Sequence, residues 1–538
     1  MRTDITLPSE PASNSIIGWR ALLPDHLILL LAIATSRWLF RSHSLYYMDS
    51  VNFALGMDYF SPVLHQPHPP GYYLYIKLAQ LVQHVLPNPN DALVAISIAA
   101  SCLAAMLTYQ LAYAWFGRAA ARWAGMLFMF SPLAWFHGTV ALIYMVEAAM
   151  AALVGYLCWL TWCGRHTMII PAAIVFGLAA GIRQSTALFL APLLLLALWQ
   201  TSWRHVLLAL GICAVTLAAW FLPMLTESGG YTAYLIALND IWSSAVVPTS
   251  VIYMPRSPLI HIGLLTIACV LCFGVGTPLL FVRGLPVTPP PGGWIFLAAW
   301  LIPGLLFFLI VYFPLVALGY ALFLSIPLFA VLGAKIAALP VIRKGGNKRW
   351  LLILVSGAVH IGLFLYVPLY TSQAGVTRNV QELPQIEQGI RAIAIPEKTL
   401  VVVFEAYFYG FRHLGYSLPE YLVLSYPEHR AGVFAMQSRR TKILDKIPIG
   451  QYEQFVLYFP EARDVEIYHQ YLPGFITGSV GTVSAGGYVF LTGPVSALVK
   501  IFPNTFRIDQ DIHIQYHQSK ILLDPAGIQM PTTTAIIR

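Results

Sequence analysis

The sequence predicts an α-helical polytopic membrane protein followed by a small α/β domain. Of its 538 residues, 58% are hydrophobic and only 10% are charged, whereas soluble proteins typically carry about 25% charged residues. The mean hydropathy is +0.70. Apolar runs of about 20 residues, the length that crosses a bilayer, recur through residues 1–370. Residues 371–538 have shorter, β-rich runs instead. This pattern excludes a simple soluble enzyme.

The charges divide the chain at the same point. Residues 1–370 contain 17 Lys and Arg and 9 Asp and Glu, which account for the whole formal net charge of +8, and residues 371–538 contain 14 of each. In a membrane protein an excess of basic residues usually reports topology. The basic character therefore requires no nucleic-acid partner, and we expect none.

The apolar runs and their flanks predict about eleven membrane spans. Twelve basic residues of the membrane part then lie on one side and five on the other, and the positive-inside rule puts the N-terminus in the cytoplasm and the C-terminal domain outside. The expected spans are 22–40, 91–116, 119–137, 147–163, 168–182, 186–200, 205–224, 258–281, 294–313, 315–337 and 350–369.

Gly71–Leu86, in the first outer loop 41–90, is apolar but short for a span. Lys77, Gln80 and His84 recur in it at spacings of three and four residues, which gives a helix one polar stripe. We interpret it as an interfacial helix on the outer leaflet.

Residues 371–538 predict a separate α/β domain. Its expected strands include Thr399–Phe404, Gln454–Tyr458 and Gly487–Leu491, with turn signals and polar or helical stretches between them. The predicted domains are therefore a transmembrane domain, 1–370, and an extracytoplasmic α/β domain, 371–538.

The first outer loop carries the residues best suited to chemistry. Asp49 follows the first span, and the amphipathic run Val51–Phe60 comes after it. A partly desolvated carboxylate flanked by Tyr46 and Tyr47 can act as a general base. The alternative is that Asp49 caps the following helix, because Asp is a favoured N-cap.

Three further residues of this loop have two interpretations each. Asp58 is either a second carboxylate of the site or a solvated residue on the polar face of the short helix. His65 and His68 have a metal-compatible spacing, but the prolines at 67, 69 and 70 exclude a regular helix, and no Cys or Glu completes a ligand shell. We therefore expect no metal.

The loop resembles the first periplasmic loop of GT-C superfamily integral membrane glycosyltransferases, especially bacterial relatives of protein O-mannosyltransferases and of the lipid A aminoarabinose transferase. The likeness rests on Asp49 and on the run His-Pro-Pro-Gly-Tyr-Tyr that begins at His68. It covers most of the first 190 residues and is patchy beyond. Other similar segments are Phe116-Gly117-Arg118, Tyr144–Glu147, Gly181–Ser185 and Arg412–Tyr421.

The resemblance implies inverting transfer of a sugar from a polyprenyl-phosphate-linked donor to a hydroxyl of a glycan, lipid or protein, on the outer side of a bacterial cytoplasmic (inner) membrane. In that scheme Asp49 is the general base. Cationic groups would bind the donor phosphate, since a lipid phosphate leaves as a stable anion. The candidates for this role are Arg183, His68 and Arg256. The candidates for substrate binding are Glu147, Asp58, Tyr47, His65 and Tyr253.

Some alternatives stay open within this scheme. Arg183 is either a phosphate ligand or a snorkelling Arg at a helix end. Glu147 orients the acceptor, pairs with Arg183 or caps its span. Ser50 replaces the Glu that is usual in the family, and no Asp-x-Asp is present in the loop, which disfavours a metal-dependent reaction; we expect no cofactor.

Two other classes of function compete with a glycosyltransferase. A lipid or glycan transporter or flippase predicts broken helices at matching places in two halves, and the sequence has no such inverted repeat. A non-catalytic polyprenyl-binding assembly protein predicts that the C-terminal domain is the active module.

Overall fold

The computed structural model comprises two compact units. Unit 1 comprises Met1–Ser42, Tyr72–Thr226 and Ala245–Gly375, and unit 2 comprises His43–Gly71, Glu227–Ser244 and Val376–Arg538. The described residues are 15–253, 258–282, 285, 287–367, 369–404, 406–426, 433–444, 446–447, 449–458, 460, 481–485, 488–496, 506–509 and 511–514.

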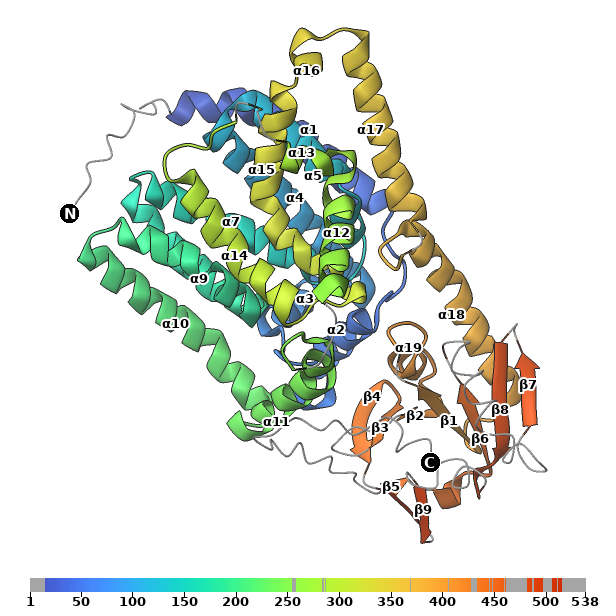
Figure 1. Ribbon diagram of the computed structural model, residues 1–538. Helices are drawn as coiled ribbons and strands as arrows, with labels where there is room; N and C mark the ends of the chain where they lie inside the picture. Colours follow the sequence, from blue (N-terminus) through green and yellow to red (C-terminus); the bar gives the residue numbers. More distant parts are fainter. Residues whose placement is uncertain are drawn as a thin grey trace. The chain divides into compact units, whose positions relative to one another are not determined.

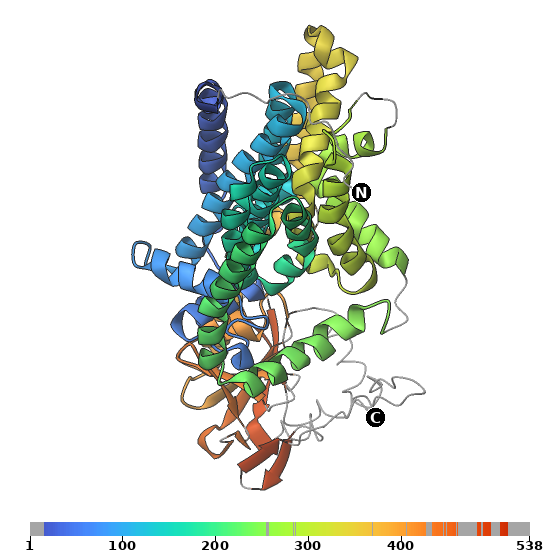
Figure 2. The same cartoon turned by 90° about the vertical axis from the view of Figure 1, so that its left-hand side faces the viewer.

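Unit 1 is helical (Figures 1 and 2). In the described part of the chain, eight segments are long and apolar enough to cross a membrane. They coincide with eight of the predicted spans: Leu22–Leu39 within α1 (Ser15–Leu39), α4 (Pro89–Phe116), α7 (Tyr144–Trp162), α10 (Trp203–Glu227), α12 and α13 (Pro258–Phe273 and Thr277–Phe281), α14 (Gly293–Ile310), the segment Leu315–Ala338 that contains α15 (Leu322–Ala338), and α17 (Asn347–Tyr366).

The other three predicted spans are shorter helices. The segment 119–137 is two helices, α5 (Arg118–Phe130) and α6 (Pro132–His137). Pro132 has no amide hydrogen to bond back to α5, and Ser131 caps α6 by accepting a bond from the Ala134 amide at 3.3 Å. The segments 168–182 and 186–200 are α8 (Ile169–Ile182) and α9 (Gln184–Trp199), of 14 and 16 residues.

The core of unit 1 is formed by α4, α5, α7 and α15, which pack against one another. Small residues allow this close approach, as is usual between membrane helices. At Gly333 of α15, for example, an added Cβ would lie 2.5 Å from the Ala120 carbonyl oxygen of α5. The long helices α10 and α17 are mostly exposed on the outside of this bundle, as expected of helices that face lipid.

The predicted interfacial helix is present as α3 (Tyr73–Gln83). Tyr75 and Ile76 are fully buried, and Lys77 and Gln80 are half-buried. One side of the helix therefore packs, while the other carries the exposed Leu78 and Leu81 beside these polar residues. Its position at the outer leaflet stays a prediction. The loop between α15 and α17 contains α16 (Pro340–Lys344).

Unit 2 contains a mixed sheet. Its described strands have the order β4-β3-β2-β1-β6-β8-β7, with β1 parallel to β2 and to β6 and the other neighbours antiparallel. Val401 of β1 aligns with Val423 and Val456, and the central strands are buried. The strand bounds are β1 Thr399–Phe404, β2 Leu422–Tyr426, β3 Val433–Gln437, β4 Arg440–Leu444, β6 Gln454–Tyr458, β7 Gly481–Ala485 and β8 Tyr488–Pro494.

The predicted strands Thr399–Phe404 and Gln454–Tyr458 are confirmed with the same bounds, and the third corresponds to β8. The other described elements of unit 2 include α2 (Met48–Asp58), the 3-10 turns Pro62–Leu64 and Ile449–Gln451, α11 (Tyr231–Ile241), α18 (Gln373–Ile393), α19 (Phe411–Ser417), and a small sheet of β5 (Lys446–Ile447), β9 (Phe506–Asp509) and β10 (Asp511–Ile514).

The helix expected at Val51–Phe60 is α2, but it is not amphipathic in its surroundings. Every residue from Ser50 to Met57 is buried, and α2 packs against α19 of the C-terminal domain. Unit 2 thus groups residues 43–71 of the first outer loop with the C-terminal domain.

Candidate functional site

Asp49 lies in the first turn of α2. The N-cap is Tyr47, whose amide donates to the Ser50 hydroxyl at 3.3 Å, so Asp49 does not occupy the capping position considered above. A helix N-terminus carries partial positive charge that favours a carboxylate. The side chain of Asp49 is 23% exposed, which leaves it accessible to a small polar group of a substrate.

His68 lies within ion-pair distance of Asp49. Its Nδ1 lies 3.5 Å from Asp49 Oδ1, and its side chain is 18% exposed. The two residues are far apart in sequence and meet because the loop turns back after α2. We call them the Asp49 pair. A carboxylate that an adjacent imidazole holds in place can act as a general base.

His65 belongs to a different pair. It has a left-handed backbone (φ 54°), and its Nε2 lies 3.7 Å from Asp240 Oδ2 of α11. Among the described residues, no group of three or more His, Cys, Asp or Glu is arranged to hold a metal ion.

Asp58 lies apart from the carboxylate of Asp49, and Tyr47 is covered by other side chains. Asp58 is exposed at the far end of α2, and nine residues of helix separate the two acids by roughly 13 Å along the axis. Partial burial raises the pKa of Asp58, and Arg439 acts in the opposite direction. Tyr47 is 2% exposed, with its ring against Tyr46 and Phe408.

Arg183 and Glu147 form a second cluster, in unit 1. Arg183 is the extended connector (φ −156°, ψ 120°) between α8 and α9, and its Nη1 donates to Glu147 Oε2 at 3.0 Å. Thr186 donates to the other carboxylate oxygen at 2.7 Å. The guanidinium lies 3.9 Å from the Tyr320 ring centroid. We call these four residues the Arg183 cluster.

The Arg183 cluster is buried. The side chains of Arg183 and Glu147 are 10% and 2% exposed, so Arg183 does not extend to the surface as a snorkelling side chain does, and Glu147 has the paired arrangement among the alternatives considered. In the described part of the chain, Arg183 Nε has no hydrogen-bond partner. A buried donor without a partner is costly, and an anionic ligand would satisfy it.

The two remaining predicted site residues are Tyr253 and Arg256. Tyr253 lies in the turn 251–253 and is 37% exposed. Arg256 lies outside the described residues.

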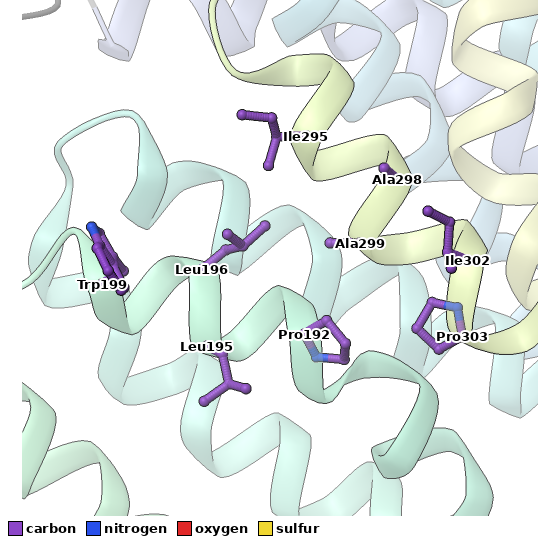
Figure 3. A pocket seen from close by; sticks show the side chains of 9 residues that line it. All are labelled: Pro192, Leu195, Leu196, Trp199, Ile295, Ala298, Ala299, Ile302 and Pro303. Atoms are coloured by element: carbon purple, nitrogen blue, oxygen red, sulfur yellow. The ribbon is translucent and has the colours of Figure 1, made fainter.

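An apolar groove lies along α9, the helix that begins at the Arg183 cluster (Figure 3). It has a volume of about 510 Å³ and runs between α9 and α14. All of its lining residues are apolar: Pro192, Leu195, Leu196, Trp199, Ile295, Ala298, Ala299, Ile302 and Pro303.

Several residues of these clusters were not foreseen. Asp240 lies in a long outer loop without a motif, and Thr186 and Tyr320 are ordinary residues of apolar helices. Arg412 and His413, which bond to the first outer loop, belong to the segment Arg412–Tyr421 that resembles the family, so a signal existed for them without a role.

Comparisons with known proteins agree with the resemblance. No family model and no curated protein sequence match the chain. Among solved structures, ArnT from Cupriavidus metallidurans bound to undecaprenyl phosphate is similar over 89% of this chain and 98% of that chain, with a TM-score of 0.54 and 14% identity. Its apo structure is similar over 89% and 99%, with a TM-score of 0.51 and 15% identity.

At this identity the likeness is one of fold. ArnT, the lipid A aminoarabinose transferase, is a membrane glycosyltransferase of the GT-C class. The match includes almost the whole length of ArnT, and thus both the helical part and the C-terminal domain. The chain therefore has the GT-C fold, as the residues of its first outer loop suggested.

Proposed function

We propose that this protein is an inverting membrane glycosyltransferase that takes a sugar from a polyprenyl-phosphate-linked donor. The observation that carries the proposal is the Asp49 pair, an accessible carboxylate held 3.5 Å from an imidazole in the loop that resembles the family. The GT-C fold supports it. The acceptor is a hydroxyl of a glycan, lipid or protein, and the active side is the extracytoplasmic one.

In the proposed reaction Asp49 is the general base. The acceptor hydroxyl attacks the anomeric carbon from the face opposite the phosphate and gives its proton to the Asp49 carboxylate. The bond between the anomeric carbon and the phosphate oxygen breaks, and polyprenyl phosphate leaves with the electron pair. His68 stabilises Asp49 in the orientation that receives the proton.

The Arg183 cluster suits the donor phosphate. A guanidinium binds phosphate oxygens through planar, directed donors, and Arg183 has a buried Nε to offer. Glu147 accepts a hydrogen bond from the guanidinium, and Thr186 in turn holds the Glu147 carboxylate in place. Arg183 is thus the proposed phosphate ligand, and Glu147 is its positioning residue.

The apolar groove suits the lipid chain. Its residues on α9, Pro192 to Trp199, lie nine to sixteen residues beyond Arg183, which corresponds to roughly 13–24 Å of helix. A prenyl chain attached to a phosphate at Arg183 can therefore follow α9 into the groove. Undecaprenyl phosphate is the ligand named for the similar ArnT structure.

The test is a transfer assay with the purified full-length protein and a set of polyprenyl-phosphate sugars, in which release of polyprenyl phosphate is measured. We expect Asp49→Asn to lower turnover by at least a hundredfold, since a positioned base contributes about 10²–10⁴-fold. Asp58→Asn, which changes the acid at the other end of the same helix, is the matched control and should keep turnover.

Native mass spectrometry of Asp49→Asn should still detect bound polyprenyl phosphate. Full turnover in Asp49→Asn would reject the proposed base. A wild-type protein that binds the lipid but moves no sugar would favour a transporter or an assembly protein.

A further inference from the structure

The C-terminal domain bonds directly to the loop that carries the Asp49 pair. Both belong to unit 2. The Met48 amide donates to the Tyr407 carbonyl at 2.9 Å, and His413 Nε2 lies 3.2 Å from the Tyr46 carbonyl oxygen. Further along the same loop, Arg412 Nη2 donates to the Leu64 carbonyl at 2.9 Å. The segment 407–413 thus holds the loop at two places.

One attachment lies just before Asp49 and the other lies four residues before His68. Tyr46 and Met48 directly precede Asp49, and Leu64 lies between α2 and His68. The separation of the Asp49 pair depends on both attachments, because α2 is a rigid spacer between them. Phe408 adds packing, with its ring 4.9 Å from that of Tyr47.

The holding side chains are themselves fixed. Arg412 is 1% exposed, its Nη1 donates to Thr441 Oγ1 of β4 at 3.2 Å, and its guanidinium lies 5.0 Å from the Phe434 ring centroid. His413 is 2% exposed. Burial lowers its pKa to about 4, so at neutral pH its Nε2 can donate to the Tyr46 carbonyl as part of a neutral ring.

The sheet topology explains why this segment is available. β1 is the central parallel strand, and the chain leaves its carboxyl end through residues 406–410 into α19. In open α/β sheets, ligands bind outside the carboxyl ends of the strands where the strand order reverses. Here that edge bonds to the chain's own first outer loop. Tyr409 in the turn has a left-handed backbone (φ 56°).

We propose that Arg412 and His413 are positioning residues, through which the C-terminal domain sets the geometry of the Asp49 pair. The effect on catalysis rests on the proposed function, whereas the attachment of the loop rests on the hydrogen bonds alone. It gives the C-terminal domain a role in the transfer step, separate from any binding of the acceptor.

The experiment uses the full-length protein and two readouts. Hydrogen exchange of peptides within 45–70 reports the loop, and steady-state kinetics with the donor lipid separate kcat from KM. In Arg412→Gln and His413→Leu we expect faster exchange in 45–70, unchanged exchange in strands β1 and β6, and kcat reduced about tenfold to a hundredfold at unchanged KM, since small displacements of reacting groups cost up to that much.

Two variants serve as controls. His413→Gln keeps a donor near the position of Nε2 and should restore kcat. Arg391→Gln removes an exposed Arg of the same domain that bonds Glu420 and Ser417 and not the loop, and it should behave as wild type. If Arg412→Gln also speeds exchange in strands β1 and β6, the comparison of His413→Leu with His413→Gln decides the proposal.

If exchange in 45–70 is unchanged in these variants, the proposal is overturned. It is also overturned if exchange there becomes faster but kcat stays the same. Exchange needs no activity, so a wild-type protein without transfer activity rejects the proposed function while the exchange result still decides the attachment.

Discussion

Arg183 and Glu147 show how single residues tie structure to the proposed chemistry. They form an ion pair whose members are 10% and 2% exposed. A buried pair is weak evidence for stability by itself, because its replacement by apolar residues is often neutral, whereas removal of one partner leaves an uncompensated charge. This asymmetry allows structural and binding roles to be separated.

We predict that Arg183→Met lowers the free energy of unfolding by about 3–5 kcal/mol, because Glu147 loses its cation, and that it also weakens binding of polyprenyl phosphate. The double variant Arg183→Met with Glu147→Leu should recover most of the stability but not the affinity. Thermal unfolding and lipid titration measure the two quantities. Recovery of the affinity in the double variant would assign Arg183 a purely structural role.

His413 gives a pH dependence at the same scale. Its pKa is lowered from 6.5 to about 4 by burial, so between these values the unfolded state binds more protons than the folded state. The free energy of unfolding therefore falls as the pH falls from 6.5 towards 4, by roughly 3 kcal/mol in total.

We expect His413→Gln to lack this part of the pH dependence. Hydrogen exchange of the β1 and β6 peptides, measured for both proteins across that pH range, checks it. Parallel pH profiles in wild type and variant would contradict the assignment.

At the scale of elements, α9 joins the Arg183 cluster to the apolar groove. We predict that Leu196→Trp, which fills the groove between α9 and α14, weakens binding of polyprenyl phosphate about tenfold and leaves a short-chain prenyl phosphate unaffected. Leu207→Trp on the outer surface of α10, where Leu207 is 60% exposed, is the control for an added indole. Equal weakening of the long and short lipids would show that the groove does not hold the chain.

At the scale of the whole molecule, the charge distribution predicts orientation. Cys163 is exposed next to the predicted cytoplasmic Arg165, and Ser438 is exposed in the turn between β3 and β4. In intact spheroplasts a membrane-impermeant maleimide should label Ser438→Cys and should not label Cys163 until the membrane is opened. The reverse pattern would put the C-terminal domain in the cytoplasm. The variant Cys163→Ser gives the background.

The sequence by itself determined the class of protein, most of the spans and the central strands. Apolar length and the β-rich run Thr399–Phe404 are local properties, and a helix or strand follows from them wherever it packs. The sequence also indicated Asp49, His68 and Arg183 as candidate site residues, and their roles stay proposals. It did not predict the break at Ser131–Pro132, because the apolar run continues through it.

Only the tertiary structure decided which of these residues meet. The sequence offered His68 and Arg183 as phosphate ligands, and the structure places His68 beside Asp49 and Arg183 beside Glu147. It also buries both faces of α2 and bonds the loop to Arg412 and His413. Contacts between distant segments depend on how the chain turns and which way each side chain points, and neither is written in local hydrophobic patterns.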